Sequence, residues 1–268
     1  MESVLGTAPP RPRQPIVRWY RTILALGLAA VLSAIVSCAS ENSGFEYLRL
    51  QVDGQPTLAI TKKDVFIRGV VVYFHGADED EFALTSDDAR QSMTDHLVNA
   101  GFAVVASRAG GNAFTDPATL QNYRELGSMA LQHYRIENMY FLAESQGSIA
   151  AINLLASSFT PVRGLAAIRP ALDAGGEAGM WASQAGQGAP TLQKMTAPLA
   201  LPAESLDGRS MRFYVNDDAS PSESTRITEF EQRFGPTADI SVVSCTDGGA
   251  ESSCVQGEDI VKWFTALG

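Results

Sequence analysis

The segment Met139–Leu155, MYFLAESQGSIAAINLL, contains the change of periodicity that decides the fold. Residues 139–143 form a short apolar run, which is typical of a buried strand, and residues 146–157 have the spacing of a buried helix. Between them stands the small polar tetrapeptide Glu144-Ser145-Gln146-Gly147. A serine at such a break between strand and helix is a candidate nucleophile.

Strand and helix patterns alternate on both sides of this segment. Residues 45–52 and 56–60 indicate a hairpin around Asp53-Gly54. Further strands are expected at 65–74, 102–106, 164–168, 211–215 and 240–244, and further helices at 87–100, 118–134, 223–234 and 257–266. This alternation predicts an α/β fold with a mostly parallel, doubly wound sheet. Residues 171–200 interrupt the alternation, and we expect them to form a short cap or lid.

The first 37 of the 268 residues differ in character from the rest. A basic stretch with Arg11, Arg13, Arg18 and Arg21 precedes an uncharged apolar run over residues 23–36. This run is too short for a comfortable transmembrane span and indicates a signal peptide. Its end, Ile35-Val36-Ser37-Cys38, resembles a bacterial lipobox, which implies lipidation of Cys38 in the cell envelope. The alternative is an ordinary membrane anchor that is never cleaved.

We therefore expect a lipoprotein signal peptide over residues 1–37, a tether over 38–44 and one domain over 45–268. Without the first 37 residues the chain has 16 basic and 29 acidic residues, a formal charge of −13. Such a charge disfavours binding to nucleic acid and to anionic lipid, so membrane attachment would depend on the lipid at Cys38.

Besides Cys38, the exported chain would contain two cysteines, Cys245 and Cys254. A close pair in an exported protein indicates a disulfide. No further cysteine and no histidine lies nearby in the sequence to complete a metal shell. We expect neither a metal nor a cofactor.

The residues around Ser145 suit a nucleophile on a sharp turn. Ala143 and Gly147, two positions away on either side, are small enough to avoid the strand and the helix. The helix that follows also directs free N–H groups and the positive end of its dipole toward an oxyanion formed beside Ser145.

The A-x-S-x-G pattern around Ser145 is by itself weak evidence for a nucleophilic serine. His75-Gly76 and the loop 110–114 leading to Tyr123 strengthen that evidence. Together these features resemble the α/β-hydrolase superfamily, specifically exported serine esterases of bacteria, over essentially residues 45–268. The resemblance implies that Ser145 is the nucleophile and that the N–H groups of Ala77 and Gln146 form the oxyanion hole. It implies Asp217, four residues before Pro221, as the acid, with Asp218 as the second choice. The alternative for both aspartates is simple turn chemistry.

The histidine that the resemblance implies is missing, because the chain has no histidine after Ser145. Its position would be about Gly249, or else Ala250. The other candidate bases are His75, which is better explained as a packing residue, His96 and His133, which are expected away from the site, and the loop carboxylates Asp247 and Glu251.

Two functions are compatible with these residues. The first is hydrolysis of small acyl esters through Ser145, with an incomplete triad and therefore weak or lost activity. The alternative is a non-catalytic envelope lipoprotein that binds a ligand or a partner in the former active-site pocket.

Overall fold

The computed structural model describes residues 44–114, 116–157, 162–173, 197–245 and 254–268. The strands within these ranges are β1 Phe45–Val52, β2 Gln55–Lys62, β3 Gly69–Phe74, β4 Phe102–Ser107, β5 Met139–Glu144, β6 Val162–Ile168, β7 Ser210–Asn216 and β8 Asp239–Cys245. The α-helices are α2 Asp88–Asn99, α3 Pro117–Tyr134, α4 Gly147–Ala156, α7 Pro221–Phe234 and α8 Gly257–Ala266. Three short 3₁₀ helices are η1 Ala83–Thr85, η2 Pro198–Ala200 and η3 Ala203–Leu206.

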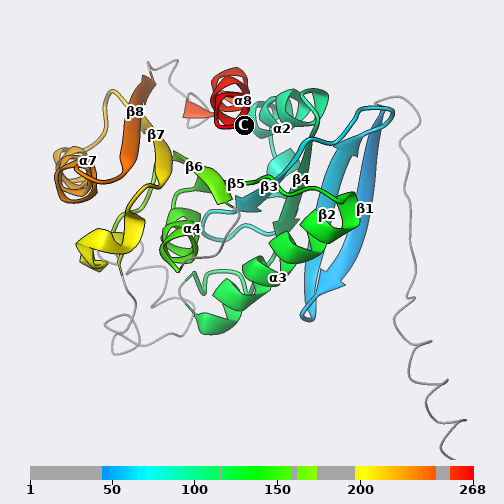
Figure 1. The fold of residues 1–268 in the computed structure, drawn as a ribbon, viewed down its shortest axis with the longest axis horizontal. Helices are drawn as coiled ribbons and strands as arrows, with labels where there is room; N and C mark the ends of the chain where they lie inside the picture. The colour runs from blue at the N-terminus through cyan, green and yellow to red at the C-terminus, as the bar shows by residue number, and fades with distance from the viewer. Residues whose placement is uncertain (1–43, 115, 158–161, 174–196, 246–253) are drawn as a thin grey trace, which may run out of the picture. The chain divides into compact units, whose positions relative to one another are not determined.

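The strands form one sheet in the order β1-β2-β4-β3-β5-β6-β7-β8 (Figure 1). β1 pairs antiparallel with β2, and β2 with β4, whereas the pairs from β4 through β3 to β8 are parallel. Every residue of β3, β4 and β5 is buried, as expected for parallel strands covered on both faces. The prediction of a mostly parallel, doubly wound sheet is confirmed.

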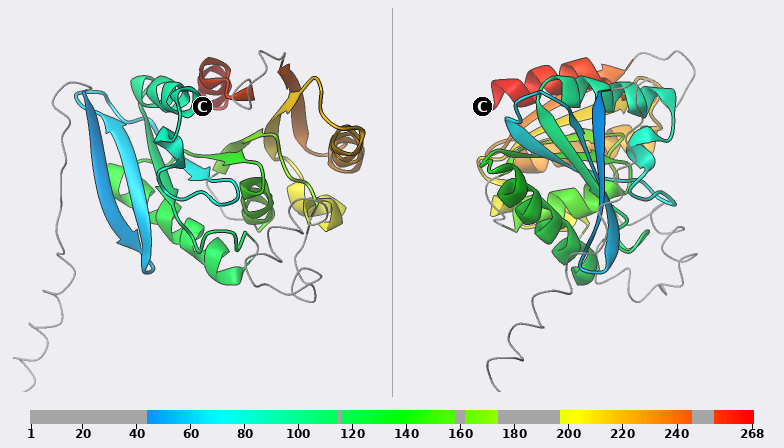
Figure 2. Two further views of the ribbon diagram at one scale, coloured as in Figure 1. Left: turned by 180° about the vertical axis from the view of Figure 1, so that it is seen from behind. Right: turned by 90° about the vertical axis from the view of Figure 1, so that its right-hand side faces the viewer.

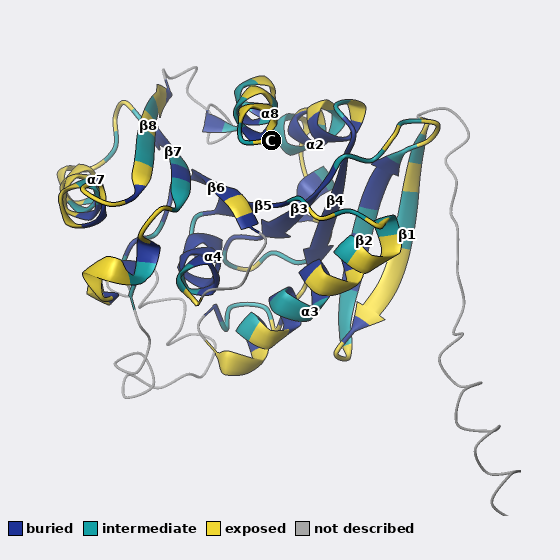
Figure 3. Cartoon of the chain, viewed as in Figure 1, coloured by how far each residue is buried: buried dark blue, intermediate teal, exposed yellow. Residues whose placement is uncertain are grey.

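Helices cover both faces of this sheet (Figures 1 and 2). α3, α4 and α7 share one apolar core with Val70, Val72 and Phe74 of β3. α2 and α8 share the other core with Val71 and Tyr73 of the same strand. Figure 3 shows the buried residues concentrated in the central strands and on the helix faces turned toward them. The alternation of side chains along β3 therefore supplies both cores.

Polar residues fix the starts of three helices. The side chain of Asp87 accepts a hydrogen bond from the backbone N–H of Arg90 at the start of α2. Asp116 and Ser220 do the same for α3 and α7, and both of these helices have proline in the first turn. Such caps satisfy N–H groups that have no partner within the helix.

The strand expected over residues 65–74 is shorter in the structure and starts only at Gly69. The expectation for residues 65–68 was wrong, although Val65 and Ile67 continue its apolar pattern. β2 and β3 are not neighbours, because β4 lies between them, so the chain must cross the sheet before β3 can pair. Phe66 is 85% exposed within this crossing.

Several expectations fall on residues outside the described ranges. These are the signal peptide and tether, most of the cap and the loop between Cys245 and Cys254. The described end of the cap region contains η2, and η3 follows with Leu206 buried. None of the helices in the described ranges combines the length and the apolar character needed to cross a membrane.

Candidate active site

Ser145 lies between the end of β5 and the start of α4 with a left-handed backbone conformation, φ 49°. Serine rarely adopts this conformation, so the surrounding structure must hold it. The N–H of Ser145 donates to the carbonyl of Ile168 on β6, at 2.9 Å, and its carbonyl accepts from Ala171 and Ser148. These bonds fix the sharp turn that the sequence predicted.

Gly147 shows why the turn requires small residues. A Cβ added there would lie 2.5 Å from the carbonyl oxygen of His75 and closer still to that of Phe74. Real Cβ atoms do not approach backbone oxygens so closely, so α4 contacts the end of β3 through a bare backbone. Ala143, on the other side of Ser145, is fully buried.

The end of β3 approaches Ser145 at Gly76. A Cβ added to Gly76 would lie 3.8 Å from the Cβ of Ser145. The adjacent N–H of Ala77 and the N–H of Gln146 have no acceptor among the described residues. These are the two groups expected to form an oxyanion hole, and their free N–H groups are compatible with that role.

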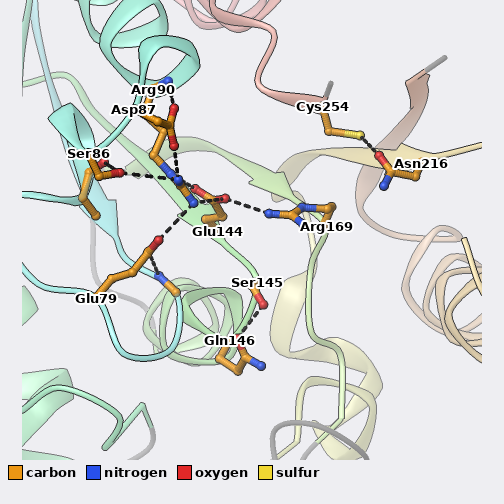
Figure 4. Close-up of polar contacts among 12 residues, drawn as sticks. Glu79, Ser86, Asp87, Arg90, Glu144, Ser145, Gln146, Arg169, Asn216 and Cys254 are labelled. Carbon is orange, nitrogen blue, oxygen red and sulfur yellow. Dashed lines mark hydrogen bonds and ion pairs between the residues drawn. The ribbon is translucent and has the colours of Figure 1, made fainter. Parts of the chain in front are cut away.

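The hydroxyl of Ser145 donates to the side-chain oxygen of Gln146 (Figure 4). Asp217 and Asp218 follow β7 at the same edge of the sheet, two strands from β5. Both are exposed, and the side chain of neither has an ion pair with a described residue. Asp217 thus follows the strand that the resemblance implied, and no hydrogen bond joins it to Ser145 among the described residues. Gly249 and Ala250 lie outside the described ranges.

None of the three histidines serves Ser145 in the structure. His75 is buried, with Nδ1 2.7 Å from the carbonyl oxygen of Gly76 and Nε2 3.0 Å from that of Arg108. His96 is exposed on α2, and His133 lines a small apolar cavity of about 90 Å³ between α3 and the β1-β2 hairpin. His75 is therefore the hydrogen-bonded packing residue that the sequence favoured.

No protein-family model matches the chain, and no curated protein matches it by sequence. Solved structures match most of its length. S-formylglutathione hydrolase from Agrobacterium tumefaciens is 13% identical, with 84% of this chain and 96% of that one covered and a TM-score of 0.64. Carboxyl esterase 2 from the fungus Tuber melanosporum is 17% identical, with 87% and 90% covered and a TM-score of 0.63. Brefeldin A esterase, a bacterial homologue of human hormone-sensitive lipase, is 15% identical, with 96% and 88% covered and a TM-score of 0.64.

The chain has the α/β-hydrolase fold. The resemblance noted in the sequence is thus confirmed at the level of the fold. In this α/β-hydrolase fold, Ser145 lies at the carboxyl end of a central parallel strand, which is where such sheets meet their ligands.

Glu144, the residue before Ser145, has a buried carboxylate whose role sequence reasoning missed. Its two oxygens accept hydrogen bonds from Arg90, at 2.6 and 2.9 Å, from Arg169 at 3.0 Å and from the hydroxyl of Tyr73 at 2.9 Å. Figure 4 shows Glu144 pointing toward Arg90 while Ser145 points the other way. This cluster holds in place the end of β5, from which Ser145 projects. The one signal in the sequence was an acidic residue directly after the apolar run 139–143.

The charges in this cluster are strongly coupled. Burial by itself lowers the pKa of Arg90, but the hydrogen bonds and the charge of Glu144 outweigh burial and raise it. Burial, followed by the charge of Glu144, raises the pKa of Tyr73 well above its usual value. Arg90 is therefore always charged and Tyr73 always neutral near pH 7.

Glu79 also contacts Arg90, and it lies next to Gly76 and Ala77 after the end of β3. Its Oε1 is 3.0 Å from a guanidinium nitrogen of Arg90, and its Oε2 accepts a 2.7 Å hydrogen bond from the N–H of Gly76. Burial raises the pKa of Glu79, Arg90 lowers it and Glu144 raises it, and the result is a raised pKa. No periodic pattern or motif in the sequence pointed to this residue.

The Cys245–Cys254 disulfide lies at the end of β8. It closes the loop in which the resemblance places the missing histidine. The Sγ of Cys254 is 2.8 Å from Oδ1 of Asn216, the residue before Asp217 (Figure 4). The N–H of Asp217 donates to the carbonyl of Cys245 at 3.2 Å. The disulfide thus connects the loop to the strand end that presents the predicted acid.

Proposed function

We propose that this chain is a serine hydrolase that acts on carboxylic esters through Ser145, with low activity because the family's histidine is missing. The observation that carries the proposal is the left-handed conformation of Ser145 at the turn between β5 and α4. Such strain persists where the surrounding structure maintains it, and it exposes the hydroxyl at the edge of the sheet. The solved neighbours named as esterases support the substrate class.

The chemistry follows from the groups around Ser145. The Oγ forms a bond to the ester carbonyl carbon and loses its proton to a base, while the carbonyl π electrons move to the oxygen. The N–H groups of Ala77 and Gln146 would stabilise that oxyanion. The alcohol then leaves with a proton, and water hydrolyses the acyl-enzyme to the free acid. Loss of one triad member leaves about 10³ to 10⁴-fold acceleration over water in well-studied cases.

Labelling by a fluorophosphonate probe tests this function. We expect slow, stoichiometric labelling, located on Ser145 by peptide mass spectrometry and abolished in Ser145→Ala. Ser148→Ala is the matched control, because Ser148 is a buried serine in the first turn of α4 whose hydroxyl has no hydrogen-bond partner among the described residues. It should be labelled at the parental rate.

Absence of labelling at high probe concentration would support the alternative function, a non-catalytic envelope lipoprotein that binds a ligand or partner. The hydrogen bond from the hydroxyl of Ser145 to Gln146, rather than to a base, is the observation that favours it. A ligand-binding protein would retain the pocket, and Ser145→Ala would leave its ligand binding unchanged.

We also propose export and attachment to the membrane through lipid on Cys38, on the basis of the lipobox resemblance. Stable attachment requires more than one acyl chain, and lipobox processing supplies several. The Cys38→Ala variant is expected to move from the detergent phase to the aqueous phase in a Triton X-114 partition of cells that express it. If the variant stays in the detergent phase, an uncleaved anchor explains the attachment.

A further inference from the structure

Glu79 and Ser145 flank the same point beside Gly76. A Cβ built on Gly76 would lie 3.1 Å from Oε2 of Glu79 and 3.8 Å from the Cβ of Ser145. Glu79 and Ser145 thus both border the space beside Gly76, while the hydroxyl of Ser145 points toward Gln146 (Figure 4). Once the serine side chain rotates away from Gln146, a proton can pass from its hydroxyl to the carboxylate through one water.

Of the two glutamates in the charge cluster, Glu79 has the weaker charge compensation. Arg90 contacts three carboxylates, those of Glu79, Asp87 and Glu144, and Arg169 contacts Glu144 again. These five side chains carry one negative charge more than positive. Glu144 receives four hydrogen bonds and is 2% exposed, whereas Glu79 has one guanidinium contact and is 23% exposed. Of these two glutamates, Glu79 is therefore the one better able to accept a proton.

We propose that Glu79 is the general base for Ser145 and takes the place of the missing histidine. This inference rests on the proposed function, in which Ser145 is the nucleophile. The Oγ–H proton moves to the carboxylate of Glu79 as Oγ bonds to the carbonyl carbon. The resulting carboxyl returns the proton to the departing alkoxide, and the cycle repeats with water as the nucleophile.

The surroundings of Glu79 suit it to this task. A carboxylate with its usual pKa is a poor base for a hydroxyl, so a raised pKa increases its basicity. Burial raises the pKa of Glu79, and the charge of Glu144 raises it further, against the lowering effects of Arg90, the Gly76 N–H and His75. Tyr73 also faces the cluster but stays neutral. The labelling rate should therefore fall as pH falls through this raised pKa, because the base becomes protonated.

The test is the rate of fluorophosphonate labelling of the full chain from about pH 4 to about pH 8. Glu79→Gln keeps an oxygen that can accept from the N–H of Gly76 but cannot take a proton. We expect its labelling rate to fall about 10²-fold at neutral pH and to lose the acidic inflection. Glu79→Ala should be equally slow, and added acetate should restore its labelling, which a purely structural role would not allow. Asp88→Asn is the charge-matched control, because Asp88 is exposed at the start of α2, and it should label like the parent.

The outcomes separate this inference from the function beneath it. Labelling of Ser145 in the parent, at the same rate and pH dependence in Glu79→Gln, overturns the role of Glu79 and leaves Ser145 as the nucleophile. A parent chain that never labels overturns both. If Glu79→Gln does not fold, a parental pH profile with no acidic inflection, together with no acetate rescue of Glu79→Ala, overturns the role of Glu79.

Discussion

Replacing Gly249 by histidine is expected to raise hydrolysis of short-chain aryl esters by about 10² to 10⁴-fold, the usual contribution of a positioned general base. Gly249 belongs to the segment between Cys245 and Cys254, whose two ends are joined by the disulfide. The N–H of Asp217 already bonds to the carbonyl of Cys245, so the loop begins beside the predicted acid. An imidazole at neutral pH is also a better base than a carboxylate.

Ala250→His is the control for an error of one residue in the assignment. Initial rates on aryl acetates and butyrates, measured with the disulfide intact, compare both variants with the parent. Combining Ser145→Ala with the more active histidine variant should abolish the increase in hydrolysis rate. If neither histidine variant exceeds the parent while both remain folded and oxidised, the loop does not present this position to Ser145, and ligand binding becomes the better-supported function.

Replacing Gly147 by alanine is expected to lower the free energy of unfolding by about 3 kcal/mol or more, because the new methyl group would meet backbone oxygens that cannot move aside. The oxygens are the carbonyls of Phe74 and His75 at the end of β3. In a domain of this size, such a loss corresponds to a fall in Tm of roughly 6 to 12 °C. Probe labelling should be lost as well, because α4 can no longer approach β3.

Gly127→Ala is the matched control for this variant. Gly127 also lies in a helix packed on the same face of the sheet, but the nearest atom to an added Cβ is Sδ of Met139, at 2.7 Å, in a flexible side chain. Gly127→Ala should lower the melting temperature less than Gly147→Ala does, as measured by thermal melts followed by circular dichroism. Equal melting temperatures for the two variants would show that α4 has room to shift and that the close contact at Gly147 is not required.

The order of elements and the position of the turn at Ser145 were determined by the sequence itself. Apolar runs and helical spacing are local properties, so the break at Ser145 and the start of α2 at its cap Asp87 could be predicted without a structure. The same local reasoning failed at residues 65–68. Their apolar pattern continues that of β3, but the position of β4 between β2 and β3 decides where pairing begins.

Only the tertiary structure decided which residues form the charge cluster around Glu144, the residue before Ser145. Arg90 lies 54 residues before Glu144, and Arg169 lies 25 residues after it, so no spacing in the sequence connects them. They meet because β5 and β6 are neighbours and because α2, which packs against β4, directs Arg90 of its first turn toward Glu144. That Glu79 and Ser145 both lie beside Gly76 depends likewise on the approach of the end of β3 to the turn at Ser145. Partners of buried charges are set by which strands pair and which helices cover them, and those contacts exist only after the sheet has assembled.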